Sequence, residues 1–187
     1  DGSKTFITNG SEAETLVVYA RTDPAVSAHG ISVFLVDGSA PGFSCSRKLE
    51  KMGMRGSPTA ELRFEGVRVP IADRLGEENC GVAMMMRGLD VERATLAGVS
   101  VGLAQAALDH ALRYARQREQ FGRPIADFQM VQKILADMYV ELTAARLLVY
   151  EAASLCVQQS SGVAKLASAA KLFASEIATR AGLAAVQ

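Results

Sequence analysis

The sequence has few of the residues that form covalent or metal cross-links. Its three cysteines, Cys45, Cys80 and Cys156, are widely spaced and form no Cys-x-x-Cys pair, and its two histidines are His29 and His110. Neither a disulfide framework nor a zinc site can be assembled from this set. We therefore expect no metal site and a reducing compartment.

An excess of charge of one sign is also missing. The 187 residues include 20 Lys plus Arg and 20 Asp plus Glu, so the positive excess that drives sequence-independent nucleic-acid binding is absent from the sequence. No apolar run approaches the ~20 residues that a membrane span needs, and the nearest candidate is Val82 to Met86. With 49% hydrophobic and 21% charged residues, the composition predicts a soluble, packed globular protein.

The first part of the chain lacks helical periodicity and has the pattern of strands. Short segments rich in β-branched or aromatic residues lie at Leu16–Ala20, Ile31–Val36 and Ala60–Val69, separated by Gly, Pro, Ser and Asp. In the last segment Leu62 and Phe64 alternate with charged residues, as expected when one face of a strand is buried. The pattern predicts an antiparallel barrel or sandwich and not a parallel sheet with helices.

From Gly81 onward the periodicity is helical. Gly81 to Arg118 contains no proline, Arg123-Pro124 breaks the pattern, and Asp127 is the expected N-cap of a second helix. That helix should end at Ser160-Ser161-Gly162, and a third, alanine-rich helix should follow from about Val163. The apolar stripe of the second helix consists of Phe128, Val131, Leu135, Met138, Leu142, Ala145 and Val149. Long antiparallel helices joined by short loops form a bundle.

The two patterns predict an α+β fold with two domains. Residues 1–75 should form the β-domain, and residues 76–187 should form part of a helical bundle. Both ends of the chain look internal to a longer polypeptide. Asp1-Gly2 is a hairpin-turn dipeptide without a preceding partner strand, and residues 169–187 are still helical in pattern where the sequence stops.

One acidic residue on the first long helix has no evident partner. Arg87, Asp90 and Arg93 are spaced three residues apart and can pair along one side of the helix. Glu92 cannot join them, because no cation lies within helical reach of it. The residues three and four positions away from Glu92 are Gly88, Leu89, Thr95 and Leu96.

Two interpretations of Glu92 follow from this placement. Its carboxylate either extends into solvent at the edge of the bundle, which is the commoner case, or points into a dry space. In a dry space desolvation would make the carboxylate a stronger base, which suits a general base that works near neutral pH. Gly88, one turn earlier, would leave room for a ligand beside it.

Four motifs occur in the order and spacing seen in the flavin-dependent acyl-CoA dehydrogenases. They are Phe6–Gly10 (FITNG), Lys51–Ser57 (KMGMRGS), Gly88–Arg93 (GLDVER) and Arg118–Ile125 (REQFGRPI). The match runs through essentially the whole chain, and the sequence resembles most the isovaleryl-CoA type of this family. The resemblance implies that the chain holds the family's middle β-domain and the first helices of its C-terminal bundle.

The resemblance gives Glu92 a chemical role. The isovaleryl and long-chain types of the family place the catalytic base in the first long helix, at the position that matches Glu92. There it would remove the α-proton of an acyl-CoA thioester while a hydride passes from the β-carbon to FAD, which gives the 2-enoyl-CoA. By the same resemblance Asp90, Val91 and Arg93 line the acyl-CoA site.

The flavin contacts are implied in the same way. Phe6, Ile7 and Thr8 resemble the strand that passes the isoalloxazine ring, with the Thr8 hydroxyl as a hydrogen-bond donor. Arg118 and Gln129 match positions that hold the FAD of a neighbouring subunit. Without the resemblance, Arg118 would be a favourable charge at a helix C-terminus, and Gln129 an exposed residue of a first helical turn.

Two further positions concern the substrate. Ala28 and His29 match a loop that contacts the CoA moiety, although an exposed loop histidine needs no such role. Ala83 stands where the isovaleryl type has a substrate-lining tyrosine, which leaves the preferred acyl chain open.

The implied function is FAD-dependent dehydrogenation of a short branched acyl-CoA, with electrons passed to an electron-transfer flavoprotein. A homo-oligomer, usually a tetramer, is implied, in the bacterial cytoplasm or the mitochondrial matrix. The alternatives are a long-chain dehydrogenase, an acyl-CoA oxidase or flavin monooxygenase of the same fold, and a non-catalytic acyl-CoA-binding or assembly protein in which Glu92 is a solvated charge. The 187 residues alone are expected not to retain FAD.

Overall fold

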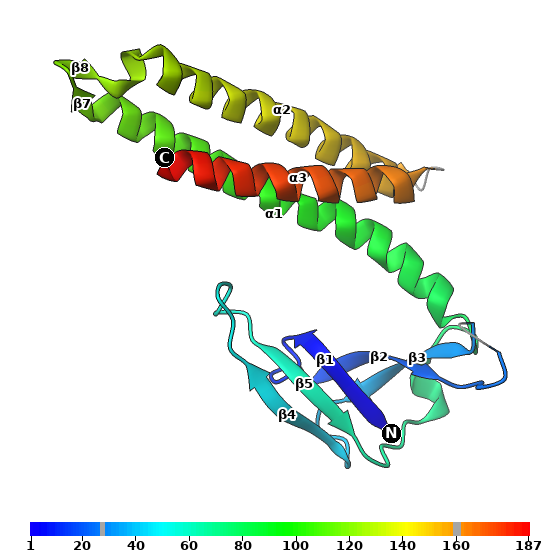
Figure 1. Ribbon diagram of the computed structural model, residues 1–187. Helices are drawn as coiled ribbons and strands as arrows, with labels where there is room; N and C mark the ends of the chain where they lie inside the picture. The colour runs from blue at the N-terminus through cyan, green and yellow to red at the C-terminus, as the bar shows by residue number, and fades with distance from the viewer. Residues whose placement is uncertain (27–28, 159–161) are drawn as a thin grey trace. The chain divides into compact units, whose positions relative to one another are not determined.

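The computed structural model describes residues 1–26, 29–158 and 162–187, and these divide into two compact units. The first unit comprises residues 1–85 and the second comprises residues 86–187. The first unit consists mainly of strands and the second mainly of helices (Figure 1). This order agrees with the predicted α+β fold.

In the first unit, the described strands form two antiparallel sheets. One sheet has the order β1-β5-β4 and is formed by β1 (Gly2–Thr8), β5 (Thr59–Phe64) and β4 (Phe43–Leu49). The other has the order β2-β3-β6 and is formed by β2 (Thr15–Arg21), β3 (Ile31–Asp37) and the short β6 (Arg74–Leu75). Between β5 and β6 lies one 3₁₀ turn, η1 (Ile71–Asp73). The two sheets share one core, formed by the buried side chains of Leu16, Val36, Ala60, Leu62 and Phe64.

Two strand predictions need correction. The segment predicted as one strand over Ala60–Val69 ends at Phe64, because Gly66 has a φ of 62° and turns the chain away. The strand β4 was not predicted, because its side chains between Phe43 and Leu49 are polar or exposed and show no apolar alternation.

The second unit contains three long helices. They are α1 (Gly81–Gln117), whose first turn belongs to the first unit, α2 (Gln129–Gln158) and α3 (Val163–Val186). One core joins all three helices, and most of its buried side chains are alanines, which let helices approach closely. Hydrogen bonds also cross between helices, from Arg146 of α2 to Gln105 of α1 and from Arg180 of α3 to Glu141 of α2.

The predicted stripe on α2 is confirmed in part, and the start of this helix is not where the sequence placed it. Met138, Leu142, Ala145 and Val149 are buried, Val131 and Leu135 are half-buried, and Phe128 lies before the helix. Asp127 is not the N-cap, because it belongs to a separate 3₁₀ turn, η2 (Ile125–Asp127).

That 3₁₀ turn follows the extended backbone of Pro124 and is closed by the N–H of Phe128, which donates to the carbonyl of Ile125. The helix α2 therefore begins two residues after Asp127, at Gln129. No described helix combines the length and apolarity that a membrane span requires.

β1 contains a β-bulge at the first of the four sequence motifs. Its pairing with β5 shifts between Lys4, opposite Leu62, and Ile7, opposite Ala60. Phe6 lies within this bulge and has a φ of 61°, in a region that bulky L-residues rarely adopt. Strain of this kind persists where surrounding structure holds it and is concentrated at functional sites.

Truncation of Ile177 tests the core of the helical unit, where this side chain is 1% exposed. We expect Ile177→Val to lower the free energy of unfolding by ~0.5–1.5 kcal/mol and Ile177→Ala by ~2–5 kcal/mol, because the larger deletion leaves a cavity. Urea unfolding of the purified full-length protein, followed by circular dichroism, measures both. If both variants lowered the free energy of unfolding by the same small amount, Ile177 would not be packed in this core.

Glycine substitutions test the backbone at Phe6. Because only glycine adopts a positive φ without cost, Phe6→Gly should be more stable than Phe6→Ala by about 1 kcal/mol. At Ser3, an exposed residue in the regular part of β1, the order should reverse, since glycine weakens a regular strand. Denaturant midpoints of the four variants give the comparison, and the same order at both positions would contradict the bulge.

Candidate active site

Asp90 and Arg93 form an ion pair on α1. The Arg93 Nη1 to Asp90 Oδ1 distance is 3.2 Å, and their side chains are 37% and 23% exposed. The thiol of Cys156, on α2, also lies 3.9 Å from the carbonyl oxygen of Asp90. Of the two pairings predicted from the three-residue spacing, Asp90 with Arg93 is present, whereas Arg87 forms no ion pair with Asp90 among the described residues.

Glu92 stands apart from this pair. Its side chain is exposed, and within the described residues its carboxylate has no ion pair or hydrogen bond. Its backbone carbonyl accepts a hydrogen bond from the Thr95 hydroxyl at 3.1 Å. Open space surrounds the position of a Cβ at Gly88.

The surface around Glu92 on α1 is apolar. Val91 is 50% exposed, Leu96 is 44% exposed and Val99 is 54% exposed. Within its own unit the carboxylate therefore lies at the surface, so residues 86–187 by themselves do not form the dry space that one interpretation of the sequence required. Glu92 therefore presents an unpaired carboxylate on an exposed apolar strip of α1, and the surface at Gly88, one turn earlier, is open.

The predicted flavin strand has one side chain in the core and two outside it. Phe6 is 76% exposed, and Thr8 is exposed and pairs with Thr59 of β5. Ile7 between them is half-buried and packs against the core of the first unit. An aromatic ring and a hydroxyl group are thus presented on one short segment of β1.

Arg118 and Gln129 flank a small structured connection between α1 and α2. Arg118 follows the last residue of α1, and its carbonyl accepts a hydrogen bond from the N–H of Ile125 at 2.8 Å. Gln129 is the first residue of α2. Both side chains are exposed, and among the described residues the guanidinium of Arg118 has no ion pair. The end of α1 and the start of α2, which these two residues adjoin, lie at the same end of the helical unit (Figure 1).

The connection itself is a hairpin of β7 (Glu119–Gln120) and β8 (Arg123–Pro124). The Arg123 guanidinium lies 4.3 Å from the centroid of the Phe128 ring, and the rings of Phe121 and Phe128 meet edge to face at 6.1 Å. Phe121 is 92% exposed with a φ of 53°. Phe121 was not predicted as a site residue, although an aromatic residue before a turn glycine is visible in the sequence.

Of the two remaining predicted residues, His29 lies between β2 and β3 and is exposed. Ala28 lies outside the described residues. The predicted flavin strand and His29 belong to the first unit, whereas Asp90 to Arg93, Arg118 and Gln129 belong to the second.

The clear pKa shifts occur at exposed positions in the first unit. A hydrogen bond from Lys48, and then the positive charge of Lys48, lower the pKa of the Glu12 carboxyl, and the same contact raises the pKa of Lys48. Hydrogen bonds from Ser39 lower the pKa of Asp37. These side chains lie at the surface, so the contacts contribute little to stability.

Comparison with known proteins assigns both units to one family. Residues 1–67 match the family model described as "Acyl-CoA dehydrogenase, middle domain" and residues 79–187 match "Acyl-CoA dehydrogenase, C-terminal domain". The chain is 50% identical over its whole length to the mitochondrial isovaleryl-CoA dehydrogenase of Oryza sativa subsp. japonica, of which it covers 46%. It is 47% identical to the mitochondrial 2-methylacyl-CoA dehydrogenase of Solanum tuberosum, of which it covers 45%.

Solved structures agree with this assignment over the whole chain. Butyryl-CoA dehydrogenase from Megasphaera elsdenii superposes with a TM-score of 0.96 at 42% identity, and the chain covers 48% of it. PigA in complex with FAD and proline superposes with a TM-score of 0.95 at 32% identity, with 48% covered. A structure described for the electron transferring flavoprotein of Acidaminococcus fermentans contains a chain with a TM-score of 0.96 at 45% identity, of which 49% is covered.

The chain spans about half the length of the curated relatives it matches. Both of its units are covered by models of a single family, in the order in which they occur in the chain. The chain therefore belongs to the acyl-CoA dehydrogenase family.

Proposed function

We propose that the whole protein is an FAD-dependent acyl-CoA dehydrogenase that converts an acyl-CoA thioester to the 2-enoyl-CoA, with Glu92 as the base. The observation that carries the proposal is the free carboxylate of Glu92 on an apolar strip of α1. The neighbouring arginine, Arg93, is paired with Asp90. The class of reaction, dehydrogenation of an acyl-CoA, is inferred from the family to which the chain belongs.

Three features of α1 support Glu92 as the proton acceptor. Arg93 is bound by Asp90, so it does not neutralise Glu92. The space beside Gly88 admits a ligand next to the carboxylate. A thioester that covered the surrounding apolar side chains would displace water from the carboxylate and strengthen it as a base. A positioned base of this kind contributes ~10²–10⁴ to a rate.

The residues at the predicted flavin positions fit the group chemically. When bound, FAD supplies the acceptor for the hydride that leaves the β-carbon. Phe6 offers an exposed aromatic face against which a planar ring can pack, and Thr8 offers an exposed hydroxyl. The Arg118 guanidinium has the planar fork that suits a pyrophosphate, and Gln129 adds an amide on the same connection.

Arg118 and Gln129 would act on the FAD of a neighbouring subunit, as the resemblance implies, which makes an oligomer, in this family usually a tetramer, part of the proposed site. An electron-transfer flavoprotein is the proposed electron acceptor. The structural relative described for the flavoprotein of Acidaminococcus fermentans supports that partner.

The proposed substrate is a short branched acyl-CoA such as isovaleryl-CoA. Two of the relatives are named after substrates with branched acyl chains, isovaleryl-CoA and 2-methylacyl-CoA. One structural relative, which is 42% identical to this chain, is named as a dehydrogenase of butyryl-CoA, a thioester with a short straight acyl chain.

Glu92→Gln in the full-length holoprotein tests the base. An amide keeps the size of the side chain and cannot accept the α-proton, so the rate of anaerobic flavin bleaching by isovaleryl-CoA should fall at least ~100-fold, with binding of acyl-CoA retained. Stopped-flow absorbance measures the rate. Glu151→Gln, which removes an exposed carboxylate from α2, should leave it unchanged.

Normal bleaching by Glu92→Gln would refute the role of Glu92. Rapid reoxidation of the product-bound reduced flavin by air, in the unmodified protein, would identify an oxidase in place of a dehydrogenase. A purified full-length protein without bound flavin would favour an acyl-CoA-binding protein.

A panel of thioesters tests the substrate. The rate constant for flavin reduction divided by the dissociation constant should be higher for isovaleryl-CoA than for butyryl-CoA, by ~10-fold or more, because one methyl group in an apolar pocket is worth ~1–3 kcal/mol. Palmitoyl-CoA should be the poorest of the three. A maximum at palmitoyl-CoA would assign the protein to long chains.

A further inference from the structure

Two of the four sequence motifs meet in the first unit. The motif Lys51–Ser57 lies in the loop between β4 and β5, and Pro58, the next residue, accepts a hydrogen bond from the N–H of Asn9 at 2.7 Å. Asn9 directly follows Thr8, the last residue of β1. The Ser57 hydroxyl also lies 3.4 Å from the Asn9 Oδ1. This loop, to which the proposed function gives no role, therefore contacts the segment that carries the predicted flavin residues.

The loop is held together by two of its own side chains. The ammonium of Lys51, which is half-buried, donates a hydrogen bond to the backbone carbonyl of Ser57. Among the described residues Lys51 forms no ion pair. The Arg55 Nε donates to the backbone carbonyl of Lys51 at 3.2 Å. Gly53 and Gly56 leave the backbone of this loop many accessible conformations, so the contact between Lys51 and Ser57 restrains it.

The restrained end of the loop leads directly into the strand that pairs with Thr8. Thr59, two residues after Ser57, is the Cα partner of Thr8 in the pairing of β5 with β1. Because β1 is an edge strand of its sheet, Thr8 is held within that sheet from the side of β5. Asn9 has a φ of 57°, and its carbonyl closes the turn that follows β1. Residues 57–59 therefore set the position of the Thr8 backbone.

We propose that Lys51 is a positioning residue for the flavin, because it restrains residues 57–59 and thereby sets where β1 presents the Thr8 hydroxyl. The inference rests on the proposed contact of Thr8 with FAD. Hydrogen bonds from a hydroxyl to an oxygen or nitrogen acceptor form over a narrow range of distance and weaken steeply when they bend. A loop without the Lys51 contact would let the hydroxyl leave that range, and FAD would be bound less tightly.

The test uses the full-length holoprotein and measures how fast it releases FAD, from the recovery of flavin fluorescence after dilution. Thr8→Val removes the hydroxyl and should accelerate release ~2- to 10-fold, the worth of one hydrogen bond. Lys51→Met keeps the aliphatic stem and removes the ammonium, so it should accelerate release by at least ~2-fold and by no more than Thr8→Val does. Both variants should shift the visible absorption of the bound flavin in the same direction.

A double-mutant cycle separates positioning from other effects of the loop. If Lys51 acts through the Thr8 hydroxyl, Lys51→Met should change neither the release rate nor the absorption once Thr8→Val is present, because effects that share one contact are not additive. Lys51→Arg, whose guanidinium can still donate to the Ser57 carbonyl, should release FAD at the normal rate. Arg55→Met removes the second contact within the loop and gives the same comparison if Lys51→Met fails to fold.

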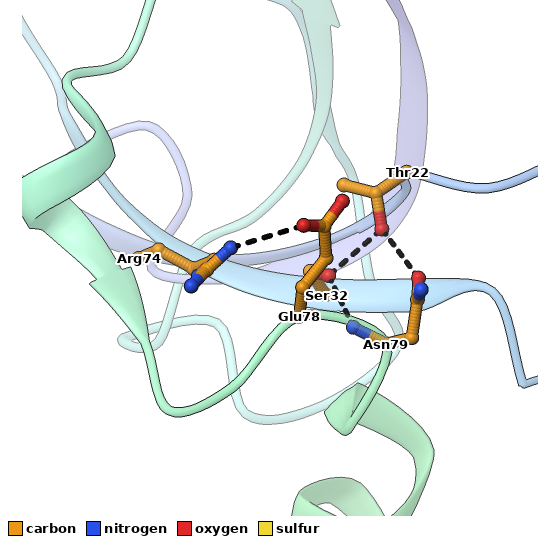
Figure 2. A network of polar contacts seen from close by, with 5 residues as sticks. All are labelled: Thr22, Ser32, Arg74, Glu78 and Asn79. Atoms are coloured by element: carbon orange, nitrogen blue, oxygen red, sulfur yellow. Dashed lines mark hydrogen bonds and ion pairs between the residues drawn. The ribbon is translucent and has the colours of Figure 1, made fainter.

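A polar network outside the four motifs provides a control for lost stability in the same unit (Figure 2). Ser32 Oγ lies 2.8 Å from Thr22 Oγ1 and 2.8 Å from the backbone nitrogen of Asn79, and Thr22 Oγ1 lies 2.8 Å from Asn79 Oδ1. Thr22→Val should lower the denaturant midpoint, because it leaves polar groups of a partly buried site unpaired, and should not change FAD release. Lys165→Met, which removes an exposed ammonium from α3, should change neither.

The outcomes distinguish this inference from the proposed function. If Thr8→Val releases FAD at the normal rate, the flavin contact of Thr8 is wrong and the positioning role falls with it. If Thr8→Val accelerates release and Lys51→Met does not, the flavin contact stands and the positioning role is wrong. Equal acceleration by Lys51→Met with and without the Thr8 hydroxyl, or by Thr22→Val to the same extent, would also overturn the positioning role.

Discussion

The ion pair between Asp90 and Arg93 is the interaction on which the proposed chemistry depends. Arg93 is directed to Asp90 at 3.2 Å, and no cation lies three or four positions from Glu92 on the helix, so Glu92 keeps a free carboxylate. A cation beside Glu92 would favour its charged form and weaken it as a proton acceptor. In the turn of α1 around residue 90, one acidic side chain thus pairs with the nearby arginine, and the other is the one that we propose accepts the proton of the substrate.

The predicted site residues of each unit are held by the core of that unit. In the first unit, two small sheets hold β1 with a bulge that exposes the ring of Phe6 while Ile7 stays in the core. In the second unit, alanine-rich packing aligns α1 with α2 and α3. Rigid strands and helices hold functional side chains more accurately than loops do, and the described predicted residues other than His29 and Arg118 lie in strands or helices.

Residue patterns predicted the elements whose burial is regular and missed those decided by local backbone geometry. Alternation at Leu62 and Phe64 and the stripe through Met138 and Leu142 correspond to buried faces. The early end of β5, the 3₁₀ turn that contains Asp127 and the bulge at Phe6 depend on single backbone angles, which periodicity does not report. The surroundings of Glu92 could not be predicted either, because spacing on one helix says nothing of what else covers its surface.

The most direct test of the account is a crystal structure of the full-length holoprotein with a non-reducible acyl-CoA analogue bound. The account predicts a Glu92 carboxylate oxygen within about 3.5 Å of the α-carbon, the separation of a near-attack arrangement, with Asp90 still paired to Arg93. A Glu92 side chain in open solvent, with a different carboxylate at the α-carbon, would contradict it.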